Sequence, residues 1–279
     1  MKNLAPYNDD CFEVHKMAVK KKRDITLKNR LKAIEGLIET EYKTFDDKFS
    51  RNQLYILIPS KQLQSAKDDL LELYGYQTAV IRAVRGNIRN LQVKTIITTC
   101  QNCTIDTVNS LDHILPKSSF PEFVVNPRNL FPCCTSCNSF KLDSIAKGNK
   151  SEFLNLYLDS LPTVQYLFVD VLLDVNGDLD FQYRLENVNN AIDSDLFSKI
   201  SGHFKGLHLF DRMKLKSIEY ISEIENKITS HRHRLQLSEI ATDLIDAAYK
   251  DKIAYGSNHW RCILEIGLLT SSNFMKRFT

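Results

Sequence analysis

The sequence predicts a mostly helical protein of the α+β class: a central module of two strands and a helix, flanked by helical segments and followed by a β-hairpin. Three observations predict this fold. The 279 residues include only seven prolines and nine glycines, so few residues interrupt helices. Apolar residues recur at helical spacing in residues 1–95 and again in 192–279. Two Cys-x-x-Cys pairs enclose residues 104–133 and mark the module.

Composition and charge set limits on location and partners. The chain is 43% hydrophobic and 25% charged, which is ordinary for a soluble globular protein. Its net charge is only +3, so any affinity for nucleic acid must come from local patches. No apolar run reaches the length of a membrane span, and the start MKNLAPYNDD lacks the apolar stretch of a secretory signal. We therefore expect a cytoplasmic protein with no membrane partner.

Residues 1–95 are expected to be a helical N-terminal region. A helix over 28–45 is predicted by the apolar face formed by Leu31, Ile34, Leu37, Ile38 and Tyr42.

A further helix is predicted over 77–90. It carries Arg82, Arg85 and Arg89 at i, i+3 and i+7. The opposite face is expected to hold Val80, Ala83, Val84 and Ile88. The arginines form either a solvated helix face or a stripe that contacts phosphates, and they are candidate nucleic-acid-binding residues.

The two Cys-x-x-Cys pairs predict a metal site. They consist of Cys100 with Cys103 and Cys134 with Cys137. Four thiolates from two tight turns can hold one tetrahedral zinc ion, and such a site has no open position for water, so its role is structural. A disulfide pair or a redox motif is the alternative, but a cytosolic chain keeps its thiols reduced, which favours metal binding. Three further cysteines lack this spacing and are expected to be free: Cys11, Cys133 and Cys262.

Polar residues between and after the cysteine pairs form a second pattern. Asp112 and His113 end a short apolar stretch, and Asn129 follows later in the insert. Asn138 and Lys141 lie three residues apart in a predicted helix, so they share one face. Two strands and a helix held by zinc would bring Asp112, His113 and Asn138 together.

These residue types suit phosphodiester hydrolysis, which needs an activated water and a cation at the phosphate. A neutral imidazole makes His113 the candidate general base. The carboxylate of Asp112 and the amide oxygen of Asn138 are hard ligands, which favour Mg²⁺ or Mn²⁺ over softer ions. Lys141 is a candidate to neutralise a phosphate oxygen.

Residues 100–141 resemble the HNH nuclease family in its zinc-containing ββα-metal form. The resemblance rests on DHILPKS, on Asn129-Leu130 and on CTSCNSFK. It implies the ββα-metal fold, the general base His113, and a catalytic ion held by Asp112 and Asn138. It also implies that Asn129 orients the loop carrying His113. Asn138 stands where many members have histidine, an H-N-N variant shared with the HNH domains of RNA-guided Cas nucleases.

The module is expected to span residues 96–150, with a break at Gly148 and Asn149, and 151–279 to form the C-terminal region. Asn176-Gly177 predicts the turn of a β-hairpin, because this dipeptide is a strong signal for a tight hairpin turn. Helices follow from residue 192. One is expected to bury an apolar stripe formed by Leu215, Ile218, Ile221, Ile224 and Ile228.

The expected function is a metal-dependent endonuclease acting on DNA. The alternatives are an RNA-cleaving nuclease, or a zinc-held nucleic-acid-binding or scaffold module without cleavage. Proteins of this kind and size resemble nuclease subunits of bacterial antiphage systems, as in Septu-like systems and certain retron effectors. The sequence has no P-loop, so ATP control would require an ATPase partner subunit. One such site cuts one strand, so cutting both would imply a homodimer or repeated nicking.

Overall fold

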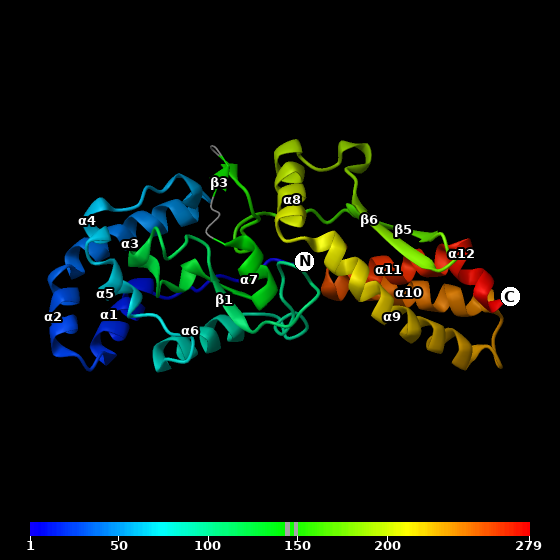
Figure 1. Cartoon of the computed structure of the whole chain (residues 1–279), viewed down its shortest axis with the longest axis horizontal. Coiled ribbons are helices and arrows are strands. Elements are labelled where there is room, and N and C mark those ends of the chain that lie inside the picture. The colour runs from blue at the N-terminus through cyan, green and yellow to red at the C-terminus, as the bar shows by residue number, and fades with distance from the viewer. Residues whose placement is uncertain (143–145, 148–149) are drawn as a thin grey trace. The chain divides into compact units, whose positions relative to one another are not determined.

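The computed structural model describes residues 1–142, 146–147 and 150–279, and it confirms an α+β protein that is mostly helical (Figure 1). The predicted break at Gly148 and Asn149 lies outside these residues. The chain forms two compact units, one of Asn3–Cys100 with Thr107–Ser160 and one of Met1–Lys2, Gln101–Asp106 and Leu161–Thr279. The division into 1–95, 96–150 and 151–279 stays a prediction. In the described part of the chain, no helix is both long enough and apolar enough to cross a membrane.

Helices fill the N-terminal part of the first unit. They are α1 (Cys11–Lys21), α2 (Ile25–Ala33), α3 (Glu35–Ser50), the 3-10 turn η1 (Leu54–Ile56), α4 (Lys61–Gln64), α5 (Lys67–Leu71) and α6 (Ala79–Asn90). Side chains of Asp10, Asp24 and Thr78 cap α1, α2 and α6 by accepting backbone N–H bonds at their first turns. These caps fix where the three helices begin.

The helix predicted over 28–45 is interrupted. Ile34 takes φ −105° and ψ 4°, which ends α2 and starts α3. The expected apolar face is only partly buried as a result: Leu31, Ile38 and Tyr42 are buried, whereas Ile34 and Leu37 are half-buried. Phe45 and Phe49 continue the buried face of α3 instead.

A short hairpin and a helix follow in the same unit. Strand β1 (Ser110–His113) pairs antiparallel with β2 (Leu130–Cys133), and the register places His113 opposite Leu130 and Ser110 opposite Cys133. Two 3-10 turns, η2 (Pro121–Phe123) and η3 (Pro127–Asn129), lie in the connection. Helix α7 (Thr135–Lys141) follows β2 directly. The order strand, strand, helix is the one that the sequence predicts. A further two-stranded pairing joins β3 (Ala146–Lys147) to β4 (Lys150–Ser151).

The second unit contains the predicted β-hairpin. Strands β5 (Leu167–Leu173) and β6 (Leu179–Leu185) pair antiparallel, and the intervening turn places Gly177 at φ +84°. Helices follow: η4 (Val188–Asn190), α8 (Ser194–Gly206), α9 (Leu209–His231), α10 (Leu237–Tyr255), α11 (Trp260–Thr270), α12 (Ser272–Met275) and η5 (Lys276–Phe278). Strand β5 packs closely on α11, because a Cβ at Gly267 would lie 2.6 Å from Val169 Cγ1.

The apolar stripe expected on α9 is wrong at its first two members. Leu215 is 65% exposed and Ile218 is 56% exposed. The buried face consists instead of Leu209, Met213, Ser217, Tyr220, Ile224 and Ile228. Ser217 tolerates burial because its hydroxyl bonds Tyr183 Oη at 2.8 Å and Met213 O at 2.8 Å.

Candidate functional site

Four cysteines converge as predicted. The sulfur atoms of Cys100, Cys103, Cys134 and Cys137 all lie within 4.8 Å of one another, and all four residues are buried. Backbone N–H groups donate to two of them, Ile105 N to Cys103 Sγ and Cys137 N to Cys134 Sγ, both at 3.4 Å. Buried sulfurs at this spacing form a donor set suited to zinc, so the cluster can bind a zinc ion.

The remaining cysteines lie outside this cluster. Cys11, Cys133 and Cys262 are buried free thiols. Burial raises the pKa of Cys133 well above its ordinary value and that of Cys262 to about 11, so both stay protonated at neutral pH. The sequence spacing predicts that Cys134 is a metal ligand and that its neighbour Cys133 is not, and the cluster contains Cys134 without Cys133.

A cavity of about 360 Å³ brings together three of the predicted site residues. Asp112 and His113 reach it from the end of β1, and Asn138 reaches it from α7. Asn129 and Lys141 do not line it. The other lining residues are Tyr74, Tyr76, Asn109, Ser110, Leu111, Pro116, Lys117 and Leu142.

His113 is held with one ring nitrogen tied to the backbone. Its Nε2 lies 2.9 Å from the carbonyl oxygen of Val124. A carbonyl only accepts hydrogen bonds, so Nε2 carries the hydrogen and Nδ1 holds a lone pair. Burial lowers the pKa of His113 to about 4, with a smaller contribution from Lys117 and Lys141. The imidazole is therefore neutral at pH 7, with Nδ1 able to accept a proton.

Asp112 is paired with Lys141. The ammonium lies 2.9 Å from Asp112 Oδ2 and 3.1 Å from Oδ1, and it also donates to the carbonyl oxygen of His113 at 2.8 Å. Burial raises the pKa of Asp112, and Lys141 opposes that rise. Both residues are less than 9% exposed, so the structure places Lys141 against the carboxylate and not at the surface. Its contact with phosphate stays a prediction.

The two asparagines take different positions. Asn129 is fully buried and braces the chain after His113: its Oδ1 accepts from Leu115 N at 2.7 Å, and its Nδ2 donates to Leu115 O and Phe123 O. Asn138 is half-buried and donates through Nδ2 to Ser110 Oγ at 3.2 Å. That bond turns the amide so that Oδ1 makes no hydrogen bond with the residues that the structure describes.

The three arginines of α6 divide into two kinds. Arg82 and Arg89 are exposed, whereas Arg85 is half-buried, with its guanidinium 3.9 Å from the centroid of the Tyr76 ring. The opposite face differs from the prediction, since Ile81 is buried with Val84 and Ile88 but Ala83 is exposed and Val80 half-buried.

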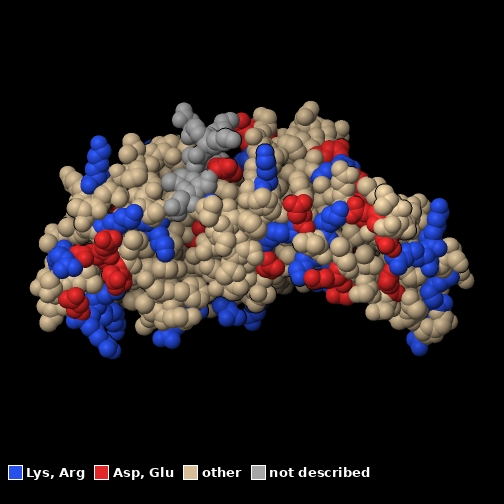
Figure 2. Space-filling view, viewed as in Figure 1, with Lys and Arg blue, Asp and Glu red and all other residues tan. Residues whose placement is uncertain are grey.

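Charged side chains of both signs are mixed on the face drawn in Figure 2. Because the net charge of the chain is only +3, a nucleic-acid surface would have to come from local groups such as these arginines. Whether they contact nucleic acid stays a prediction.

Three side chains near His113 were not predicted from the sequence as site residues. Tyr74 packs its ring against His113 with centroids 4.8 Å apart, and Lys117 places its ammonium 5.6 Å from the Tyr74 ring centroid. Tyr76 lines the same cavity. The two tyrosines lie on the segment before α6, and no local pattern links them to the cysteine module. Lys117 had a signal, because it lies within the DHILPKS motif.

Comparisons with known proteins give one distant relative. The chain is 23% identical over 196 residues to Protein ea31 of Escherichia phage lambda, and the match covers 63% of each chain. The chain thus spans less than two thirds of the length of that relative. No known family profile matches the sequence. No solved structure matches the fold.

Proposed function

We propose that the chain is a metal-dependent endonuclease of the HNH type, in its zinc-containing ββα-metal form, that hydrolyses phosphodiester bonds in DNA. One observation supports this most strongly: a histidine, a carboxylate and an amide line one cavity on two paired strands and the following helix, and Nδ1 of that histidine makes no hydrogen bond with a described residue. These groups are what hydrolysis of a phosphodiester needs in one place.

His113 is the proposed general base. Its Nδ1 takes a proton from water as the water oxygen bonds to phosphorus. The bond from phosphorus to the leaving oxygen breaks, and that oxygen keeps the electron pair and takes up a proton from solvent water. Burial keeps the imidazole neutral above pH 4, so the base is in its reactive form at neutral pH. The bond from Nε2 to Val124 O fixes the ring, and it would stabilise the imidazolium formed by proton uptake.

Asp112 and Asn138 are the proposed holders of a catalytic Mg²⁺ or Mn²⁺. Such an ion at the scissile phosphate stabilises the developing charge. The residues fit this role: Asn138 Oδ1 is unbonded among the described residues, and a carboxylate offers about four lone-pair positions, of which Lys141 uses two. Oxygen donors favour these ions over Ni²⁺ or Zn²⁺.

The four-cysteine cluster has a structural role in this proposal. A zinc ion held by four thiolates fixes the start of α7 beside β1, and so sets where Asn138 lies relative to Asp112 and His113. Asn129 also has a structural role, because it positions the chain that follows His113 and does not itself line the cavity.

One observation favours the alternative of a zinc-held binding or scaffold module without cleavage. The Lys141 ammonium already neutralises Asp112, so the carboxylate needs no further cation for its own stability. RNA as the substrate is the other alternative, because a metal ion and an imidazole do not by themselves exclude it. Antiphage defence, an ATPase partner subunit and a homodimer remain proposals at the level of pathway and assembly.

The test is cleavage of supercoiled plasmid by the purified protein. We expect nicking with Mg²⁺ or Mn²⁺ and none with Ni²⁺ alone or with a chelator of divalent ions. Asp112→Asn should abolish it with zinc still bound. Competition with an RNA of the same sequence separates the two substrates. Cleavage that persists in Asp112→Asn would contradict the proposed metal site.

A further inference from the structure

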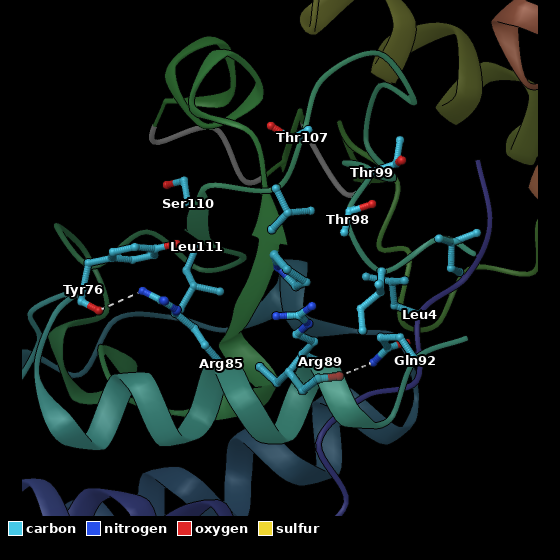
Figure 3. Close-up of a pocket in the computed structure, with 15 residues that line it drawn as sticks. Leu4, Tyr76, Arg85, Arg89, Gln92, Thr98, Thr99, Thr107, Ser110 and Leu111 are labelled. Atoms are coloured by element: carbon cyan, nitrogen blue, oxygen red, sulfur yellow. Dashed lines mark hydrogen bonds between the residues drawn. The ribbon is translucent and has the colours of Figure 1, made fainter. Parts of the chain in front are cut away.

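A second cavity, of about 320 Å³, lies beside the one that contains His113. Its floor is α6, from which the side chains of Arg85 and Arg89 rise toward the segments that carry Thr98 and Leu111 (Figure 3). We call it the arginine pocket. All of its lining residues belong to one compact unit: Leu4, Tyr76, Arg85, Ile88, Arg89, Gln92, Ile96 to Thr99, Thr107, Val108, Ser110, Leu111 and Pro132.

The charged residues that line the arginine pocket are all positive. Arg85 and Arg89 line it and no carboxylate does, so the lining carries two positive charges without compensation. Neither arginine forms an ion pair with a described residue. Two guanidiniums spaced four residues apart on one helix face can both reach a single anion. Phosphate oxygens match their planar donor geometry.

Arg85 is already oriented for such a ligand. Its guanidinium stacks on the Tyr76 ring at 3.9 Å from the centroid, and Nη1 donates to Tyr76 O at 3.2 Å. A guanidinium has five N–H donors, so this bond leaves donors for an anion. Stacking fixes the plane of the group before any ligand arrives, which lowers the entropy lost on binding.

The rest of the wall is apolar or carries hydroxyl groups. Leu4, Ile88, Ile96 and Leu111 supply apolar surface, and several threonines supply hydroxyls. An inorganic anion would make no contact with the apolar part, whereas a nucleotide presents both a phosphate and a flat base whose face can pack on apolar side chains. The volume falls within the range of small-ligand pockets.

The arginine pocket adjoins the proposed active site. Tyr76, Ser110 and Leu111 line both cavities. We propose that the arginine pocket binds a nucleotide of the substrate strand next to the scissile phosphate, with its phosphate on Arg85 and Arg89 and its base on the apolar wall. This inference rests on the proposed nuclease function. It makes Arg85 and Arg89 substrate-binding residues and gives Arg82 no part in that contact.

The experiment measures binding of a fluorescent single-stranded DNA oligonucleotide to the full chain, without added divalent ions so that no cleavage occurs. We compare the wild type, Arg85→Gln/Arg89→Gln, Arg89→Gln alone and the control Arg234→Gln, at an exposed arginine outside both cavities. Loss of two charge-assisted contacts predicts binding weaker by about tenfold or more for the double variant. The slope of log affinity against log salt should fall by about one to two units. Arg234→Gln should bind within about twofold of the wild type.

Wild-type affinity in the double variant would overturn the inference. Arg89 is exposed and forms no ion pair with a described residue, so Arg89→Gln keeps the test valid if the double variant does not fold. A deoxynucleoside 5′-monophosphate that binds more tightly than the oligonucleotide would assign the pocket to a free nucleotide and overturn the strand assignment.

Plasmid cleavage separates this inference from the function on which it rests. If the wild type cleaves and the double variant does so with unchanged KM, the pocket assignment alone fails. If the wild type does not cleave but the arginines still govern oligonucleotide binding, the nuclease proposal alone fails.

Discussion

Lys141 Nζ lies 2.9 Å from Asp112 Oδ2, with both side chains buried, so the last residue of α7 is joined by charge to the third residue of β1. The same ammonium donates to the carbonyl oxygen of His113 at 2.8 Å. One lysine therefore holds both residues at the end of β1.

Removing Lys141 should cost much of the stability of this unit. Lys141→Met leaves a buried carboxylate without its partner, which predicts a loss of about 3 kcal/mol in the free energy of unfolding. Chemical denaturation measures it. Lys216→Met, which breaks an exposed pair with Glu219, should cost less than about 1 kcal/mol. Adding Asp112→Asn to Lys141→Met should restore part of the loss, because the unpaired charge is then gone. A Lys141→Met protein as stable as the wild type would show that the pair does not support the fold.

Asn129 should be the more costly of two buried asparagines to replace. Asn129→Ala removes three hydrogen bonds to backbone groups in the loop after His113, which predicts a loss of about 3 kcal/mol or more. Asn126 is equally buried, but its side chain makes one such bond, to Arg128 N. Asn126→Ala should therefore cost about 1 kcal/mol. Denaturant titration of both variants decides this, and equal losses would contradict the bracing role.

The sequence predicts more of the module between the cysteines than of the rest of the fold. The spacing of the cysteines indicated which four would meet, and Cys133 is not among the four that do. Asp112, His113 and Asn138 reach one cavity because strand order and helix register, both visible in the sequence, determine where they lie. The pairing of Lys141 with Asp112 was not predictable, because the shared helix face of Asn138 and Lys141 does not determine which group the Lys141 ammonium contacts.

Periodicity was less informative in the long helices. On α9 the expected stripe included Leu215 and Ile218, which are exposed, and it omitted Ser217, which is buried. An apolar pattern cannot identify a buried hydroxyl whose partner, Tyr183, comes from another element. Tyr74 near His113 was missed for the same reason: a tertiary contact leaves no local pattern.

Glu122 should make stability depend on pH. Burial raises the pKa of Glu122 from 4.5 to about 7, and its Oε2 has no hydrogen-bond partner among the described residues. The folded protein therefore holds this proton between pH 4.5 and 7 while the unfolded chain releases it. The contribution to stability is full below pH 4.5 and is lost as pH rises through 7. Glu122→Gln should be more stable than the wild type by on the order of 3 kcal/mol at pH 8 and similar to it at pH 5. Thermal unfolding at both pH values measures this, and a difference that does not change with pH would contradict it.

Adjacent cysteines should differ in metal binding. Cys134→Ala removes one of four ligands, so we expect the bound zinc to be lost and the unit to unfold at lower temperature. Cys133→Ala is the matched control and should keep about one zinc ion per chain. Elemental analysis of the purified proteins decides between them. Zinc retained by Cys134→Ala and lost by Cys133→Ala would reverse the ligand assignment.

The most direct test of the central claim is the rate of plasmid nicking by His113→Ala. We predict that the wild type nicks supercoiled DNA with Mg²⁺, and that His113→Ala is slower by about 100-fold or more, because the general base is gone. Zinc content and melting temperature should show that the variant is folded, and His231→Ala, at an exposed histidine, should match the wild type. Nicking by folded His113→Ala at the wild-type rate, or no nicking by the wild type, would contradict the account.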